Sequence, residues 1–411
     1  MKMKPSVKNA ILIGALCSIS YFAVYNARNV LGAVSAAMIE QEIATRDVVI
    51  GTLPSLFFVF YAVGQLINGV IGNRVKARYM LSVGLLMAGI TNLIFPSVIQ
   101  SGNLTLSYAC YGLCGFFLSM IYGPMTKVVA ENTEPVYTTR CSLGYTLASF
   151  LGSPSAGFLA AFLSWQSVFR VSSIALFLMA ACCFGFFLLF EKKGIVRYGQ
   201  YKRQKSSGGS VKVLITKYQF IKFCLISIIT GVIRTSVVSC LTTYSYDHLN
   251  FSEDKAPLLF SVMSCVIALS AFVSISIYEA LRRNMDATLL LMFSLSTVFF
   301  LVTYLVHSPM VNLIFLTAAI LCSNCSATML WSRYCPSLRD TGVVSGATGF
   351  LDFLSYMAAG SANVIFGAVV VKSGWSPLIL VWMGLMLFGV ILSLPYDKLF
   401  QKKKASAGAE A

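Results

Sequence analysis

The chain has 411 residues, of which 57% are hydrophobic and 11% charged, and its mean hydropathy is +0.78. A soluble domain carries about 25% charged residues, so this composition excludes a soluble globular protein and indicates one that lies mostly in lipid. The net charge of +16 would suggest nucleic-acid binding in a soluble protein. Here the basic residues fall in alternate loops, and we expect no nucleic-acid partner.

Apolar segments long enough to cross a bilayer, about 20 residues each, recur along the whole chain. We expect twelve of them, at roughly 10–38, 48–72, 78–98, 105–129, 138–163, 166–190, 219–246, 256–278, 287–307, 309–332, 342–371 and 376–396. The sequence therefore predicts an all-α membrane protein whose twelve transmembrane helices form two pseudo-symmetric six-helix bundles.

The first segment carries a permanent charge near its middle. Arg28 lies in a run of Ile, Leu, Ala, Val, Phe and Tyr, with Asn26 and Asn29 beside it. A charge in hydrocarbon costs about 2.5–3.5 kcal/mol even on the mildest insertion scale, so such a residue faces a protein interior, a water-filled cavity or an anion. Tyr21, Tyr25 and Arg28 are spaced i, i+4 and i+7, which puts them on one helix face. We expect this face to line a substrate pathway.

Two later segments of the first half carry polar stripes at helical spacing. Tyr61, Gln65 and Asn68 form one in the second segment, and Tyr145 and Ser149 form another in the fifth. A single stripe of this kind more often makes hydrogen bonds between helices than it contacts a ligand. We include Tyr61, Gln65 and Tyr145 among the predicted substrate-binding residues. The two tyrosines are the stronger candidates, because phenols can bind a hydroxylated substrate.

The longest polar stretch, 191–218, divides the chain into segments 1–190 and 219–411. It holds eight basic residues and a run of Ser and Gly at 206–210. We interpret it as a cytoplasmic linker between an N-terminal and a C-terminal six-helix bundle, facing the anionic inner leaflet.

Landmarks recur in the two halves at similar spacing. Arg74 lies 46 residues after Arg28, and Arg282 lies 48 after Arg234; a tryptophan follows at 137 residues in the first half and 141 in the second. This agreement indicates an internal duplication. Two six-helix repeats with a site between them are typical of an alternating-access transporter.

The seventh segment repeats the buried charge of the first. Arg234 follows Ser227 and Thr230 on one helix face. If the halves pack pseudo-symmetrically, Arg28 and Arg234 face each other across a central cavity, where two guanidinium groups repel unless an anion lies between them. Arginine suits an oxyanion because it binds phosphate bidentately and stays charged. The alternative is neutralisation within the protein, but Asp352 is the only carboxylate deep in a predicted span and cannot fully pair both.

Asp352 lies in the eleventh segment, with Ser345, Thr348 and Tyr356 on the same helix face. It can be a proton carrier, an acid that contacts substrate, a gating partner of Arg234 or a member of a static salt bridge. The sequence leaves these alternatives open.

The other reactive residues form no catalytic or metal-binding pattern. Cys322 and Cys325 form a C-x-x-C inside a predicted span, and we interpret them as small packing residues. His248 and His307 are too few and too far apart in sequence for a metal site. We expect no enzyme activity, no cofactor and no metal.

The distribution of charge predicts the orientation. With the N-terminus in the cytoplasm, 25 of the 31 Lys and Arg residues lie in or beside cytoplasmic segments. The outer loops instead hold Glu40, Glu42, Asp47, Asp247, Glu253 and Asp254. By the positive-inside rule, both termini are predicted to be cytoplasmic, in the inner (plasma) membrane.

The stretch 69–78, Gly-Val-Ile-Gly-Asn-Arg-Val-Lys-Ala-Arg, resembles the loop signature of the major facilitator superfamily. In that family a glycine, an acidic residue and an arginine hold the inward gate. The resemblance implies a gating loop that includes Gly69, Asn73 and Arg74. Asn73 stands where the acidic residue is usual. The resemblance therefore gives less support to a gate held by an ion pair than to one held by hydrogen bonds.

Within that superfamily, the chain is most similar to the organophosphate:phosphate antiporters, the group of glycerol-3-phosphate and hexose-phosphate transporters. The stretch 21–29, Tyr-Phe-Ala-Val-Tyr-Asn-Ala-Arg-Asn, resembles their tyrosine-rich first helix, and 342–375 resembles their glycine-rich eleventh. The resemblance implies that Arg28 and Arg234 are the phosphate-binding pair. It also implies that the family's tyrosines fall on Tyr21, Tyr25 and Tyr61.

Two positions depart from that family. Gln65 replaces a lysine common in the glycerol-3-phosphate carriers, and Ala148 replaces their histidine, while Asp352 is added. A substrate of different charge or size is therefore expected, and the exchange partner need not be inorganic phosphate.

We predict a secondary active transporter that moves a small organic anion, such as a sugar or glycerol phosphate, by alternating access as a monomer in the lipid bilayer. The alternatives are a non-transporting membrane sensor of a phosphorylated metabolite and, more weakly, a drug-efflux carrier, since cavity arginines repel cations. The predicted substrate-binding residues are Arg28, Arg234, Tyr21, Tyr25, Tyr61, Gln65, Tyr145 and Asp352.

Overall fold

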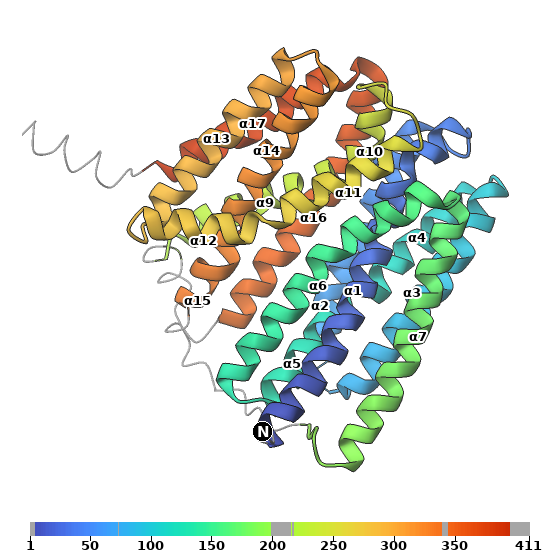
Figure 1. Ribbon diagram of the computed structural model, residues 1–411, viewed down its shortest axis with the longest axis vertical. Coiled ribbons are helices and arrows are strands. Elements are labelled where there is room, and N and C mark those ends of the chain that lie inside the picture. The colour runs from blue at the N-terminus through green and yellow to red at the C-terminus, as the bar shows by residue number, and fades with distance from the viewer. Residues whose placement is uncertain (1–4, 73, 199–214, 216–217, 339–343, 395–411) are drawn as a thin grey trace, which may run out of the picture.

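The computed structural model describes residues 5–72, 74–198, 215, 218–338 and 344–394. Within these ranges the regular structure is entirely helical, and the helices form two groups, α1–α7 and α9–α17, that lie side by side (Figure 1). The predicted all-α class is confirmed.

The first group contains the helices of the N-terminal half; elements marked η are π-helical. Its members are α1 (Pro5–Glu40), η1 (Asp47–Thr52), α2 (Leu53–Ile71), α3 (Ala77–Gln100), α4 (Leu104–Leu118), α5 (Tyr122–Asn132), α6 (Pro135–Phe162) and α7 (Trp165–Lys192). α1 packs against α6 and α7, α2 packs against α4, and α3 packs against α4 and α7.

The second group contains the helices of the C-terminal half. Its members are α9 (Phe220–Val232), η2 (Ile233–Val237), α10 (Val238–Asp247), α11 (Lys255–Ala268), α12 (Ser270–Ala280), α13 (Met285–Leu305), α14 (Pro309–Met329), η3 (Leu330–Tyr334), α15 (Cys335–Ser337), α16 (Val344–Ser373) and α17 (Trp375–Ser393). α13 packs against α14 and α17, and α16 packs against α9.

Each predicted span coincides with one of these helices or with consecutive ones, so that, for example, η1 and α2 together form the second span. Of the helical segments in the described ranges, 11 are long and apolar enough to cross a membrane. The remaining span, α6, is less apolar because Ser149, Ser153, Pro154 and Ser155 lie in its middle. The predicted division at 191–218 stays a prediction, since most of that stretch lies outside the described residues.

Glycine lets α1 approach α6 closely. A Cβ atom on Gly152 would lie 2.8 Å from the backbone carbon of Tyr25 and 2.9 Å from the nitrogen of Asn26. The Asn26 amide also donates to Ser155 Oγ at 2.7 Å. The turn of α1 that directly precedes Arg28 is thereby held against α6.

The two halves meet at the end of the molecule where α1 finishes. There Arg46 binds Asp247 through two hydrogen bonds of 2.8 and 3.0 Å, and Thr243 Oγ1 donates to Ser35 Oγ at 2.7 Å. At the same end α16 packs against η1, and the interface continues where α16 packs against α2 and α6 against α11. The two halves are therefore in contact at the end of the molecule opposite residue 5 (Figure 1).

Candidate functional site

Arg28 lies in an aromatic cage at mid-helix. Its Cζ atom is 4.7 to 5.2 Å from the ring centroids of Tyr25, Phe58, Tyr61 and Tyr356. Its Nη1 donates a hydrogen bond of 2.9 Å to the Tyr356 hydroxyl. Faces of aromatic rings attract cations, so the cage holds the guanidinium in place without cancelling its charge.

Arg234 lies in η2, the π-helical interruption of the seventh span. π-Helical turns occur frequently at functional sites. Its Cζ is 5.8 Å from the ring centroid of Tyr356, so one tyrosine contacts both arginines. Its Nη2 is buried and has no hydrogen-bond partner among the described residues. Leaving a buried donor unsatisfied costs about 1–3 kcal/mol, and more for a charged group, so this atom lacks an acceptor that a ligand can supply.

Close packing of α16 on α9 positions this region. Ser227 Oγ donates to the carbonyl oxygen of Leu351 at 2.7 Å, and a Cβ atom on Gly231 would lie 2.9 Å from Ser355 Cα. These contacts fix the turn of α16 that carries Asp352 beside Arg234.

Asp352 neutralises the arginines only in part. Its carboxylate interacts electrostatically with Arg234 and Arg28 and lies near the Gln65 side chain. No carboxylate oxygen of the described residues is within 4.0 Å of a nitrogen of either arginine, although ion pairs of that length occur elsewhere, as between Arg46 and Asp247. The static salt bridge considered for Asp352 is therefore absent in this state.

A second group of phenols adjoins the cage. The ring of Tyr21 lies 4.9 Å from Tyr25, 5.6 Å from Tyr122 and 6.2 Å from Tyr145. The hydroxyl of Tyr145 makes a 2.6 Å hydrogen bond with Ser142. These rings extend the aromatic surface from Arg28 along α1 to α6.

The structure thus brings six of the predicted residues together, the two arginines included. It places Tyr21 and Tyr145 in the adjoining group. The six are Arg28, Arg234, Tyr25, Tyr61, Gln65 and Asp352.

The predicted gating loop lies apart from this site, at the end of α2. Gly69 and Arg74 are exposed there, and Asn73 lies outside the described residues. The Lys127 ammonium donates to the carbonyl oxygen of Gly72 at 3.1 Å and ties the loop to α5. The gating role of the loop stays a prediction.

Three residues of the site were missing from the predicted set. Tyr356 was placed on the helix face of Asp352 but not among the binding residues, although the i+4 spacing was a usable signal. Phe58 lies three residues before Tyr61, on the same face of α2. Tyr122 gave no signal, because it follows the break between α4 and α5.

Comparison with known proteins identifies a family. The model of the Major Facilitator Superfamily matches residues 17–360. The chain is similar to the membrane sensor protein UhpC of Salmonella typhimurium (31% identity over 77 residues, 19% of this chain and 17% of that protein). It is also similar to a probable hexose phosphate transport protein of Chlamydia pneumoniae (22% over 129 residues, 30% and 28%) and to UhpC of Escherichia coli (39% over 46 residues, 11% and 10%). The matched segments therefore span less than a third of each relative.

Solved structures share the fold over nearly the whole chain. A D-xylose–proton symporter superposes with a TM-score of 0.73 at 12% identity, covering 94% of this chain and 97% of the other. A bacterial homologue of the human lysosomal transporter Spinster, in an inward-facing and unoccupied conformation, gives 0.67 at 11% identity, covering 95% of both chains. At this identity the likeness establishes the fold alone.

Proposed function

The chain belongs to the Major Facilitator Superfamily, and from that premise we propose that it is a secondary active transporter of a small organic anion. The observation that carries this proposal is the buried Nη2 of Arg234, which has no hydrogen-bond partner among the described residues, close to a second arginine. Two guanidinium groups with one nearby carboxylate leave the site with a net charge of about +1, since 1 + 1 − 1 = 1. An anion supplies both the missing charge and the missing acceptor.

The substrate class we propose is a phosphate monoester of a sugar or polyol. A phosphoryl group offers several acceptor oxygens, enough for both guanidinium groups. The phenols of Tyr25 and Tyr61 beside them suit the hydroxyl groups and the carbon skeleton of the organic part. The similarity to a probable hexose phosphate transport protein supports this choice.

The transport cycle we propose is alternating access. The halves touch through Arg46–Asp247 and Ser35–Thr243 at the end opposite residue 5. If the N-terminus is cytoplasmic, as the distribution of basic residues predicts, the end joined by these contacts is the outer one. Substrate that contacts both halves has a higher affinity for the conformation closed at both ends than for one open at either end. This difference in affinity favours the change of conformation.

Uptake of labelled glucose 6-phosphate and glycerol 3-phosphate into proteoliposomes tests the proposal. Arg28→Lys and Arg234→Lys each keep the charge but lose the planar fork, and we expect each to abolish uptake while the protein stays folded. Arg170→Lys, on the outer part of α7, is the matched control and should transport normally. Normal uptake by both site variants would remove the arginines from the substrate site.

A second candidate function is a membrane sensor of a phosphorylated metabolite. The similarity to two membrane sensor proteins favours it. The same arginines would then bind the ligand, but no flux would follow. Saturable binding of a phosphate ester to wild-type protein, with no uptake in proteoliposomes loaded with any counter-anion, would select the sensor over the transporter.

A further inference from the structure

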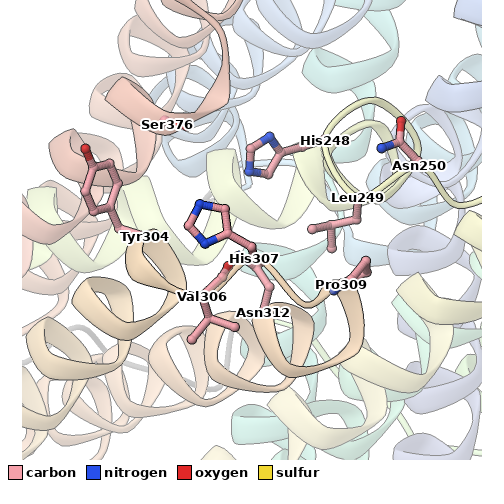
Figure 2. A pocket seen from close by; sticks show the side chains of 9 residues that line it. All are labelled: His248, Leu249, Asn250, Tyr304, Val306, His307, Pro309, Asn312 and Ser376. Carbon is pink, nitrogen blue, oxygen red and sulfur yellow. Dashed lines mark hydrogen bonds between the residues drawn. The ribbon is translucent and has the colours of Figure 1, made fainter.

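A pocket of about 180 Å³ lies among the end of α10, the connection from α13 to α14 and the start of α17. It is lined by His248 and His307, the only histidines of the chain. Figure 2 shows their imidazole rings turned toward each other from separate segments. The fold therefore brings together two side chains whose separation in sequence argued against a metal site, so that separation does not keep them apart in space.

A hydrogen-bonded frame holds the segments that carry the two histidines, of which His248 is half-buried and His307 is exposed. The Tyr244 hydroxyl donates to Asn312 Oδ1 at 2.6 Å, and Asn312 Nδ2 donates to the carbonyl oxygens of Thr303 and Val306 at 2.7 and 3.1 Å. These bonds fix the connection that carries the second histidine. The ring of Tyr244 also packs 5.1 Å from the ring of His248, so the first histidine is fixed by the same frame.

The ring nitrogens of both histidines are free to bind a ligand. Neither ring makes a hydrogen bond to another residue in the described ranges. Burial, and to a lesser extent the neighbouring His307, lower the pKa of His248. A lowered pKa favours the neutral form of the ring, which is the form that binds a metal ion.

The donor set selects one class of ligand. No carboxylate or thiol lines the pocket; besides the two imidazoles its polar side chains are those of Asn250, Tyr304, Asn312 and Ser376. Nitrogen donors suit Cu²⁺, Ni²⁺ and Zn²⁺, whereas Mg²⁺ and Ca²⁺ need oxygen donors. We propose that this pocket binds a single divalent transition-metal ion through one nitrogen of each of His248 and His307, with water completing the coordination.

The pocket adjoins a contact between the two halves of the molecule. His248 directly follows Asp247, which binds Arg46 across the two halves. A metal ion held here restrains the end of α10 that carries this contact. The pocket belongs to the C-terminal half and shares no residue with the arginine site, so the metal proposal does not depend on the proposed substrate.

Electron paramagnetic resonance of the full-length, untagged protein titrated with Cu²⁺ tests this proposal. We expect one bound ion at a copper concentration on the order of 10 μM, with nitrogen hyperfine couplings from two imidazoles. His248→Gln and His307→Gln should each weaken binding at least about tenfold, and the double variant should lose the couplings. Tyr304→Phe, which alters a pocket residue outside the proposed coordination, is the matched control and should bind as wild type.

Two results overturn the proposal. One is the absence of a bound, nitrogen-coordinated copper ion in the wild-type protein. The other is retention of wild-type affinity and couplings in the double variant, since no histidine then remains in the chain. The melting temperature of each variant, measured without metal, verifies that a loss of binding does not reflect unfolding.

Discussion

Arg28 and Tyr356 join the two halves at their centre: the guanidinium of α1 donates a 2.9 Å hydrogen bond to the phenol of α16. The same phenol ring lies 5.8 Å from Arg234 Cζ. A substrate anion that reaches Arg28 therefore meets a guanidinium group of which one N–H is already bonded to Tyr356. We expect the substrate to compete for this hydrogen bond, which links the two halves.

Tyr356→Phe keeps the ring and removes the hydroxyl, so Arg28 loses its internal partner. A hydrogen bond to a charged group contributes about 1.5–3 kcal/mol, and about 1.4 kcal/mol is a factor of ten in affinity. We therefore expect phosphate esters to bind roughly tenfold more tightly, as measured by calorimetry. Tyr111→Phe is the control, because Tyr111 packs against Phe57 and Phe95 and makes no hydrogen bond or cation–π contact with either arginine in the described structure. Weaker binding by Tyr356→Phe would show that its hydroxyl contacts the substrate directly.

Asp352→Asn raises the net charge of the arginine site from about +1 to about +2. At an effective dielectric constant of about 20, a unit charge about 8–10 Å from a dianion changes their interaction by on the order of 3–4 kcal/mol. We expect a dianionic phosphate ester to bind at least about tenfold more tightly, with a smaller gain for a monoanionic sulfate ester. Binding that is unchanged for both ligands would show that Asp352 carries no charge in the resting state.

The ion pair between Arg46 and Asp247 should favour closure of the outer end. The side chain of Arg46 is 51% exposed, and exposed pairs contribute about 0.2–1 kcal/mol. Arg46→Asp should therefore change the ratio of open to closed molecules a few-fold in favour of the open form. This form is detected as a longer distance between spin labels at Glu42 and Asn250. Adding Asp247→Arg should restore the wild-type distance. Failure of the double variant to restore it would remove the ion pair from the gate.

Gly367→Leu should prevent the same end from closing. A Cβ atom at Gly367 would lie 3.0 Å from Gly51 Cα and 3.3 Å from the carbonyl oxygen of Asp47, which are backbone atoms of the other half. We expect the outer spin-label distance to lengthen and uptake to fall by at least about tenfold. Gly384→Leu on α17 is the matched control, since nothing lies within 4 Å of a Cβ there. Wild-type uptake by Gly367→Leu would contradict the observed close approach.

Copper binding at the histidine pocket should weaken as the pH falls. Each imidazole must be neutral to bind the metal, and protons compete below its pKa, ordinarily about 6.5. Because burial lowers the pKa of His248, this residue should stay neutral to a lower pH than an imidazole in water. We expect little change in copper affinity above about pH 7 and a progressive loss of affinity between about pH 6.5 and 5. The amplitude of the nitrogen hyperfine couplings, measured at each pH, should fall in parallel. Affinity that is constant over this range would exclude imidazole ligands.

Several features were predictable because they depend on local sequence. Apolar runs of about 20 residues determine the spans, and the i, i+4, i+7 spacing of Tyr21, Tyr25 and Arg28 determines a helix face. The matching position of Arg234 in the second half made a paired arrangement predictable as well. The exact ends of the helices were less so: α1 extends to Pro5 and Glu40, because a helix can continue into water beyond the apolar run.

By itself, the sequence determined that this chain is a helical membrane protein with two buried arginines, since local composition and periodicity suffice for both. Only the tertiary structure decided which distant side chains meet: Tyr356 with Arg28, Asp352 with Gln65, and His248 with His307. Each of these pairs depends on how far one helix slides and rotates against another. That arrangement comes from side-chain packing and glycine contacts between segments far apart in the chain, and no local pattern records it.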